Sequence, residues 1–363
     1  MSKLLFATSL SLLCTAFFYL ADNYRVKKCN FLVGVPLLIL IFFYGVRICF
    51  GVDDGSYLDM YVHNTKNSVE PLYECLIHFF FFLHSPYQFY FMGVSGICLF
   101  FLFKAIQKYR ISYFWSAIVF FTYYFLFYFN ILRQSIAVSI IFYSLFYFYK
   151  KKYKTWVFLI LCACCFHKSS FVMFGLCPLV IMVKKTYNVW FYCIPLMLII
   201  VFYNHLWEIS LKVLTVLGVN PFTRKIIEAF LTWQLEVNSG IGIRLKIISY
   251  ICFLPKFITV AKKNQFSLFM FNLFYIGVFG KYLSGQNMNF ARLFVGAHIT
   301  EFYLFPMAMK SINKKNVFKI SSLLCILGLL ILIVLFLKDF SNGFYYWDLD
   351  FTWKTHFKTV GGN

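Results

Sequence analysis

The sequence predicts an all-α polytopic integral membrane protein, and three observations support that fold class. Of its 363 residues, 61% are hydrophobic and 13% are charged, whereas about a quarter of the residues of an ordinary soluble protein are charged. Apolar runs of about 15–20 residues recur along the chain, each close to the length that a helix needs to cross a bilayer. Short clusters of Lys and Arg separate these runs, as is typical of cytoplasmic loops.

The apolar runs predict about 12 transmembrane helices in a single multi-pass membrane domain that comprises residues 1–363. Two segments between spans, at about 51–86 and 207–245, are longer than a simple turn. The first contains an apolar run too short to cross the membrane, which we expect to be re-entrant or interfacial. The second has apolar positions at helical spacing and predicts an amphipathic helix. The predicted spans are residues 4–20, 31–50, 87–107, 112–130, 131–149, 155–166, 171–183, 189–206, 246–261, 266–284, 291–309 and 319–337.

The basic clusters predict one orientation for all spans. Each cluster follows an odd-numbered span, so the positive-inside rule places those loops in the cytoplasm. Both termini and both long segments then face outward, and most acidic residues fall on the same outer side. Asp22 is cytoplasmic and Glu301 lies within the eleventh span. The alternative is that the first span is a cleaved signal peptide, but no small-x-small cleavage site follows it.

Charge and cysteine content exclude two other classes of function. The net charge of +21 comes from clusters spaced between apolar runs, whereas a nucleic-acid-binding protein gathers its basic residues on one face or tail. Most of the twelve cysteines lie inside apolar runs, where they act as small fillers of helix contacts. We therefore expect no nucleic-acid partner, no metal site and no cofactor. The aromatic content of 23% is equally explained by an AT-rich coding bias or by an aromatic function.

The stretch FYFNILRQSIAVSII, at residues 127–141, introduces a charge between the fourth and fifth spans. An ionised arginine at membrane depth costs several kcal/mol unless it is paired or reaches the interface. Helical periodicity places Asn130, Arg133 and Gln134 on one face near the outer boundary. This polar group favours a binding site, and an arginine that reaches up to lipid headgroups is the alternative.

A second polar stretch, FHKSSF, follows the sixth span on the outer side. His167 titrates near neutral pH, so it suits a general base or a phosphate ligand. Lys168 and two serines make the same turn cationic and rich in hydrogen-bond donors. The alternative is that His167 only caps the end of a helix.

The stretch GVRICFGVDDGSYLDMY adds an arginine and two carboxylates at the outer end of the second span. Carboxylates beside a cation can act as bases or bind sugar hydroxyls, although Asp and Gly also form ordinary turns. The residues concerned are Arg47, Asp53, Asp54 and Tyr57.

Two further arginines, Arg244 and Arg292, open the ninth and eleventh spans on the outer side. Together with Arg47 and Arg133 they suit an anionic ligand that carries hydroxyls, because the guanidinium fork matches phosphate oxygens. The sequence contains no phosphate-binding glycine loop, dinucleotide fingerprint, HExxH or GxSxG motif. This pattern favours an anionic, lipid-borne substrate reached from the outer leaflet.

The motifs GVDDGSYLDMY, EPLYECL, NILRQSIAVSI, FHKSSFV and NFARLFVG resemble, in this order, the EpsG-like family of Wzy-type polysaccharide polymerases. The resemblance runs from about residue 40 to 310, and RQSIA and FHKS are its more specific parts. The closing TWKTHF lacks the Pro-Tyr with which the family's tail commonly ends.

The resemblance implies a multi-pass glycosyltransferase of the bacterial inner membrane with its active face in the periplasm. Such enzymes polymerise repeat units carried on undecaprenyl pyrophosphate into O antigen of lipopolysaccharide, capsule or exopolysaccharide. Donor and acceptor are both lipid-linked, and no cofactor is needed. Membrane lipids and a chain-length regulator are further candidate partners. The resemblance also implies roles for the residues named above. The pyrophosphate would bind at Arg133 and Arg292 with Lys168, Arg244 and Gln134, and the base would be His167 or Asp53. Sugar-binding or bracing roles fall to Arg47, Asp54, Tyr57 and Glu70.

Two alternatives from other classes remain open. A flippase or transporter of lipid-linked oligosaccharides needs polar residues through the depth of the bilayer, for which Glu301 and Lys281 are candidates. A membrane O-acyltransferase also uses His and Arg, but it draws its acyl donor from the cytoplasm, and His167 is predicted on the opposite side.

Overall fold

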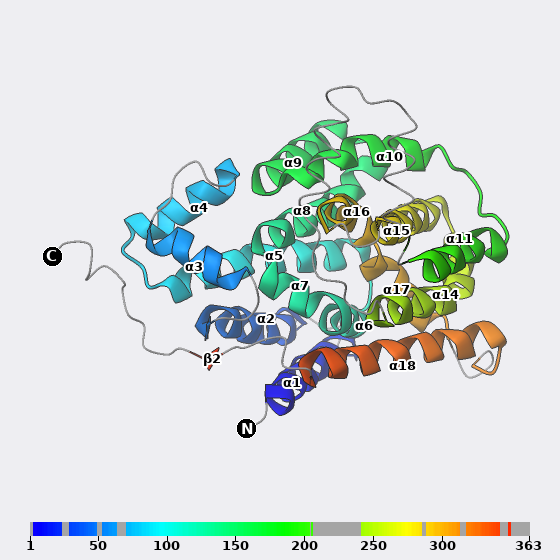
Figure 1. Cartoon of the computed structure of the whole chain (residues 1–363), viewed down its shortest axis with the longest axis horizontal. Helices are drawn as coiled ribbons and strands as arrows, with labels where there is room; N and C mark the ends of the chain where they lie inside the picture. Colours follow the sequence, from blue (N-terminus) through cyan, green and yellow to red (C-terminus); the bar gives the residue numbers. More distant parts are fainter. Residues whose placement is uncertain are drawn as a thin grey trace. The chain divides into compact units, whose positions relative to one another are not determined.

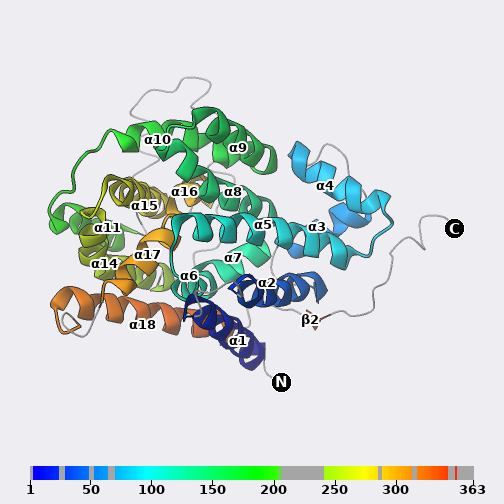
Figure 2. The same cartoon turned by 180° about the vertical axis from the view of Figure 1, so that it is seen from behind.

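The computed structural model describes residues 3–23, 29–48, 53–63, 70–203, 205, 241–284, 288–312, 317–341 and 348–349, and nearly all of them are helical (Figures 1 and 2). Two compact units divide the chain. Unit 1 comprises residues 1–174, 305–307 and 336–363, and unit 2 comprises residues 175–304 and 308–335. The predicted amphipathic helix in the segment 207–245 falls almost entirely outside the described residues.

Unit 1 is built from short and long helices, several of which pack against helices distant in the sequence. Helix α1 packs against α2 and α6, α2 packs against α5, and α8 lies between α5 and α9. The elements are α1 (Lys3–Asn23), α2 (Cys29–Val46), β1 (Arg47–Ile48), α3 (Asp54–Val62), α4 (Pro71–Phe82), α5 (Tyr87–Tyr109), α6 (Tyr113–Val119), the π-helix η1 (Phe120–Tyr124), α7 (Phe125–Asn130), α8 (Leu132–Tyr149), α9 (Tyr153–Phe166) and the 3₁₀ helix η2 (Lys168–Val172).

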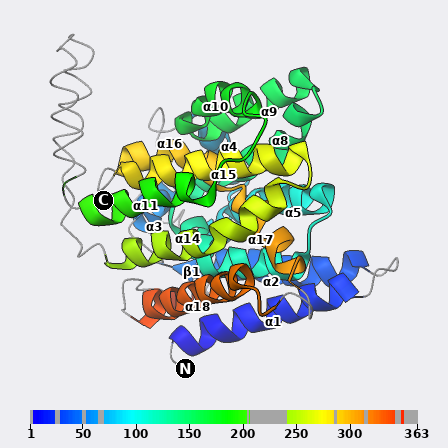
Figure 3. The ribbon, with the colours of Figure 1, turned by 90° about the vertical axis from the view of Figure 1, so that its right-hand side faces the viewer.

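Unit 2 is centred on α15, which packs against α11, α14 and α16 (Figure 3). Three helices, α10, α17 and α18, have residues in both units. The bounds are α10 (Met173–Ile181), α11 (Val189–Phe202), α14 (Ile241–Ala261), α15 (Gln265–Leu283), α16 (Met288–His298), α17 (Glu301–Lys310) and α18 (Ile320–Ser341).

The all-α prediction is confirmed for the described residues with one small exception. Strand β1 pairs antiparallel with β2 (Asp348–Leu349) in a two-residue ladder, which the sequence analysis did not predict. Helices occupy each of the twelve predicted ranges. Among the helices that the structure describes, three are long and apolar enough to cross a membrane alone, at residues 87–109, 265–283 and 320–338. The full count of spans and the outward orientation therefore remain predictions.

The eleventh predicted span is two helices rather than one. Helix α16 ends at His298 and α17 begins at Glu301, with Ile299 and Thr300 between them. The hydroxyl of Thr300 donates to the carbonyl of Ala297 at 2.9 Å, so a side chain satisfies one carbonyl at this break. Broken helices at membrane depth are tolerated where neighbouring groups satisfy the backbone in this way.

The one acidic residue predicted on the cytoplasmic side has a structural role. The Asp22 carboxylate accepts hydrogen bonds from the backbone N–H groups of Tyr113 and Phe114, each at 3.0 Å, and one from the Ser112 hydroxyl. These N–H groups begin α6 and have no partner within the helix. Asp22 therefore caps α6, and its charge also complements the positive end of the helix dipole.

Candidate functional site

The site in unit 1 is organised by the junction between α7 and α8. Helix α7 ends at Asn130, and Ile131 has φ −115° and ψ 69°, outside the helical region, before α8 begins at Leu132. Arg133 therefore lies in the first turn of α8, where its side chain projects beside the chain break. Further along α8, Ser135, Ala137 and Ser139 are fully buried, consistent with the close helix approach expected of small residues.

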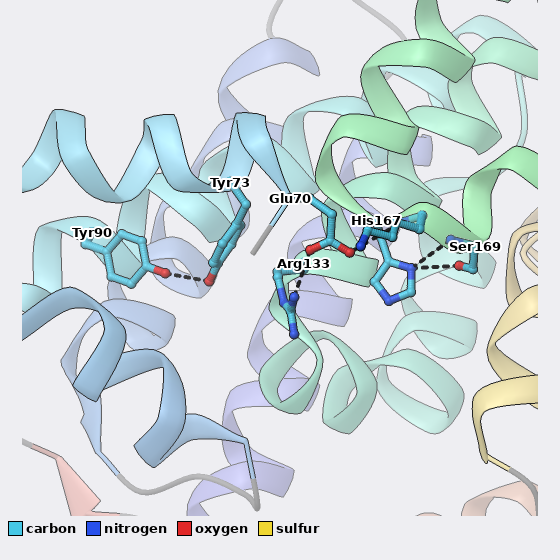
Figure 4. Close-up of polar contacts among 7 residues, drawn as sticks. Glu70, Tyr73, Tyr90, Arg133, His167 and Ser169 are labelled. Atoms are coloured by element: carbon cyan, nitrogen blue, oxygen red, sulfur yellow. Dashed lines mark hydrogen bonds and ion pairs between the residues drawn. The ribbon is translucent and has the colours of Figure 1, made fainter. Parts of the chain in front are cut away.

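Arg133 is held by an ion pair that the sequence did not specify. Its Nη1 donates to Oε2 of Glu70 at 2.7 Å, and the two side chains are 28% and 8% exposed (Figure 4). Glu70 has an extended backbone immediately before α4, where Pro71 begins the helix. The backbone N–H of Lys168 donates to the other oxygen of Glu70 at 3.4 Å. One carboxylate thus connects α4, α8 and η2.

The electrostatics of Glu70 favour a bracing role. Burial raises the pKa of its carboxyl group, but the positive charge of Arg133 and the hydrogen bonds to the carboxylate outweigh burial, and the pKa lies below its ordinary value. Glu70 is therefore ionised at neutral pH and a weak proton acceptor. Its negative charge fixes Arg133 in place.

His167 caps η2 through one of its two ring nitrogens. The backbone N–H of Ser169 donates to Nδ1 at 3.3 Å, and the Ser169 hydroxyl lies 2.7 Å from the same atom (Figure 4). Because Nδ1 accepts a hydrogen bond, the neutral ring carries its proton on Nε2. The helix-cap alternative is therefore seen in the structure, and the functional role of His167 stays a prediction that would use Nε2 as a donor.

Helix α3 completes the cluster from a fourth stretch of sequence. The backbone N–H of Asp53 donates to Oδ1 of Asn130 at 3.1 Å. One turn later, the Tyr57 ring lies 5.9 Å from the guanidinium carbon of Arg133. Burial raises the pKa of Tyr57 against the lowering effect of Arg133, and the Asp53 carboxylate raises it further. Tyr57 therefore stays protonated, between a cation and a carboxylate.

Behind Tyr57, buried tyrosines join α3 and α4 to α5. The Tyr57 ring packs edge-on against Tyr73 with ring centroids 5.8 Å apart. The Tyr90 hydroxyl donates to the Tyr73 hydroxyl (Figure 4), and both side chains are fully buried. Tyr61 stacks on Tyr90 at 4.9 Å. This packing sets the position of α3 and α4, and hence of Tyr57 and Glu70.

Most of the predicted site residues lie together in unit 1. Four separate stretches of sequence bring them there, and Gln134 joins them because its Nε2 donates to the Ser169 hydroxyl at 3.4 Å. Arg244 and Arg292 belong to unit 2. The side chains of Arg47 and Asp54 lie outside the described residues. The residues of the unit 1 cluster are Asp53, Tyr57, Glu70, Arg133, Gln134, His167 and Lys168.

A second polar cluster, in unit 2, was not predicted. The Tyr250 hydroxyl donates to Oε2 of Glu301 at 3.2 Å and lies 2.8 Å from Nε2 of His298. That nitrogen lies 3.3 Å from the same carboxylate oxygen, and His298 and Glu301 are almost completely buried. The three-residue spacing of His298 and Glu301 was the available signal, because residues three apart share one face of a helix. Across the described ranges, no group of three or more His, Cys, Asp or Glu side chains is arranged to hold a metal ion.

Comparison with known proteins gives one match. The family model described as the EpsG family matches residues 30–348, nearly the whole chain. No curated protein and no solved structure matches the chain.

Proposed function

The chain belongs to the EpsG family, whose members are polysaccharide polymerase-like membrane proteins, and from this premise we propose that it is a glycosyltransferase that polymerises lipid-linked repeat units. The donor and the acceptor are oligosaccharides on undecaprenyl pyrophosphate, and the reaction takes place on the periplasmic face of the inner membrane. The product is an O antigen, a capsule or an exopolysaccharide.

The observation that carries this proposal is the incomplete hydrogen bonding of the Arg133 guanidinium. Glu70 holds one end of the guanidinium, while the buried Nε of Arg133 has no hydrogen-bond partner among the described residues. A buried donor without a partner costs about 1–3 kcal/mol, and such groups call for an explanation. An oxygen of the substrate pyrophosphate would supply the missing acceptor, and a guanidinium already fixed by Glu70 would not need to reorganise on binding.

The proposed reaction assigns a role to each of these residues. A hydroxyl oxygen of the acceptor sugar attacks C1 of the donor sugar, the bond from C1 to the phosphate oxygen breaks, and undecaprenyl pyrophosphate leaves with the electron pair. Arg133 stabilises the negative charge that develops on the leaving oxygen. Lys168, whose backbone N–H donates to Glu70, has an exposed side chain that would supply a second positive charge to the pyrophosphate.

The hydrogen bonds of His167 support Asp53, of the two candidates, as the base in this proposal. A neutral His167 with its proton on Nε2 has its Nδ1 lone pair engaged by Ser169, so it donates to the pyrophosphate rather than accepts a proton. Asp53 then takes the proton of the acceptor hydroxyl. The bond between its backbone and Asn130 fixes this residue relative to the α7–α8 junction that carries Arg133.

The test is the glycan ladder of a polymerase-deleted strain that carries each variant. We expect Arg133→Gln to abolish long-chain product and leave single repeat units outside the cell, while the protein is still inserted. Arg110→Gln is the matched control, because Arg110 is exposed at the end of α5. A wild-type ladder from Arg133→Gln would overturn the site. Absence of any external repeat unit would indicate a flippase, and an intact ladder that lacks acyl groups would indicate an acyltransferase.

A further inference from the structure

Two polar side chains beside the α7–α8 junction have hydrogen-bonding groups that the described fold does not use. The backbone N–H of Asp53 donates to Oδ1 of Asn130 at 3.1 Å. This bond joins the residue before α3 to the last residue of α7, 77 positions apart in the sequence. It therefore brings the amide group of Asn130 and the side chain of Asp53 together.

The bond to Asp53 determines how the Asn130 amide is oriented. In an amide side chain the oxygen accepts hydrogen bonds and the nitrogen donates two. Because Oδ1 receives the Asp53 N–H group, the remaining end of the side chain is Nδ2. Within the part of the chain that the structure describes, Nδ2 has no hydrogen-bond partner. Asn130 is half-buried, so it presents an oriented donor with unused capacity.

Asp53 occupies the position at which an aspartate ordinarily caps a helix, but its side chain does not cap α3. A capping aspartate accepts a hydrogen bond from the second or third N–H group of the helix and has an extended backbone. Asp53 has φ −90° and ψ −11°, and its side chain accepts no hydrogen bond from α3. Its carboxylate also has no ion pair or other hydrogen bond among the described residues. It is a half-buried acceptor that the fold leaves unused.

These two groups lie next to the residues proposed to bind the pyrophosphate. Asn130 ends α7, Ile131 interrupts the helix, and Arg133 lies in the first turn of α8. One turn into α3, the Tyr57 ring lies 5.9 Å from the guanidinium carbon of Arg133. The donor sugar is attached to the pyrophosphate through C1, so the acceptor sugar has to approach a group held at Arg133. Asn130 and Asp53 are the unused donor and acceptor at this junction.

We propose that Asn130 and Asp53 form the subsite for the acceptor sugar, and that this sugar carries two adjacent hydroxyl groups. Asp53 accepts the proton of the attacking hydroxyl, and Nδ2 of Asn130 donates to the oxygen of the hydroxyl on the neighbouring ring carbon. Each hydroxyl both donates and accepts, so a carboxylate beside an amide N–H group matches such a pair. This inference rests on the proposed function and assigns acceptor selection to Asn130.

The experiment measures extension of a defined acceptor by the purified full-length protein in nanodiscs. Natural lipid-linked repeat units are the donor. The acceptor is a labelled repeat unit joined to undecaprenyl pyrophosphate through carbon in place of the C1 oxygen, so it can accept but not donate. Asn130→Asp keeps an oxygen for the Asp53 N–H group and removes the Nδ2 donors. We expect the acceptor KM to rise about fivefold, and extension at high acceptor concentration shows that the variant is folded.

Deoxy acceptors separate the lost hydrogen bond from the charge that the aspartate adds. Each analogue lacks one hydroxyl next to the carbon at which the product linkage forms. With the wild type, one analogue should also raise the acceptor KM about fivefold. With Asn130→Asp the same analogue should cause no further rise, because the interaction is already absent. The added charge acts on the full and the deoxy acceptor alike. If no analogue raises the acceptor KM of the wild type, or if the two effects simply multiply, the inference is wrong.

The matched control is Asn188→Asp, at the start of α11 in unit 2. Oδ1 of Asn188 also accepts a backbone N–H group, from Trp190 at 3.3 Å, and its side chain is exposed. This control should extend every acceptor as the wild type does, and an equal rise in its KM would overturn the assignment to Asn130. An unchanged acceptor KM in Asn130→Asp would overturn this inference alone. Absence of any polymerisation by the wild type would overturn the proposed function as well.

Discussion

The substitution Glu70→Gln tests whether the ion pair with Arg133 organises the site. It keeps the size of the side chain and an oxygen that can accept from the Lys168 N–H group, and it removes only the negative charge. A hydrogen bond to a charged group contributes about 1.5–3 kcal/mol, whereas an exposed ion pair contributes about 0.2–1 kcal/mol. Glu70 is 8% exposed and Arg133 is 28% exposed, so we expect a loss of about 2 kcal/mol in the positioning of Arg133. This corresponds to about a 30-fold fall in polymerisation rate.

The pH dependence of stability gives a second and independent measure of the same pair. The pKa of Glu70 is lower in the folded protein than its ordinary value, so ionised Glu70 stabilises the folded state. This contribution is present above the unfolded-state pKa of about 4.3 and is lost as the pH falls through the folded-state value. Thermal unfolding in detergent should show wild type more stable than Glu70→Gln at pH 7, with the difference vanishing in acid.

Two results would refute this reasoning about Glu70. Glycan ladders of wild-type length and rate from Glu70→Gln would show that the ion pair does not position Arg133 for the reaction. A difference in unfolding temperature between the two proteins that does not diminish as the pH falls through the acid range would show that the effect does not come from the Glu70 charge.

Two further predictions concern the packing of unit 1. Removal of the hydroxyl–hydroxyl bond by Tyr73→Phe or Tyr90→Phe should cost about 1–3 kcal/mol each, because each change leaves a buried hydroxyl without that partner. The double variant should lower the free energy of unfolding by less than the sum of the two single variants. Strictly additive losses would contradict a hydrogen bond between the two hydroxyls. Asp22→Ala should destabilise the protein by about 1 kcal/mol, because the first N–H groups of α6 lose their carboxylate acceptor. The glycan ladder should be unchanged. An unaltered unfolding temperature would show that Asp22 does not stabilise α6.

Much of the candidate site follows from the sequence because polar residues in an apolar chain are few. The stretch that carries Arg133 and the turn that carries His167 are distinguished by charge alone, and the basic clusters place both on one predicted side. The boundary between the fourth and fifth predicted spans also agrees with the structure, because Asn130 ends α7 and Leu132 begins α8. Their roles in binding and catalysis remain predictions.

The partners of these residues depend on contacts between distant stretches. Nothing in the sequence links Glu70 to Arg133, 63 positions apart, or shows that Ser169 occupies Nδ1 of His167. The sequence likewise predicts the eleventh span as one continuous helix, whereas the structure ends α16 at His298 and begins α17 at Glu301.

The sequence by itself determined the membrane class, the family resemblance and the residues able to bind a phosphate, because hydropathy and residue chemistry are local properties. Only the tertiary structure decided which charges are paired and which buried donors lack a partner. Those properties depend on packing: the buried tyrosines set the position of Glu70 beside Arg133, and the glycines of α15 allow its backbone to approach His298 of α16.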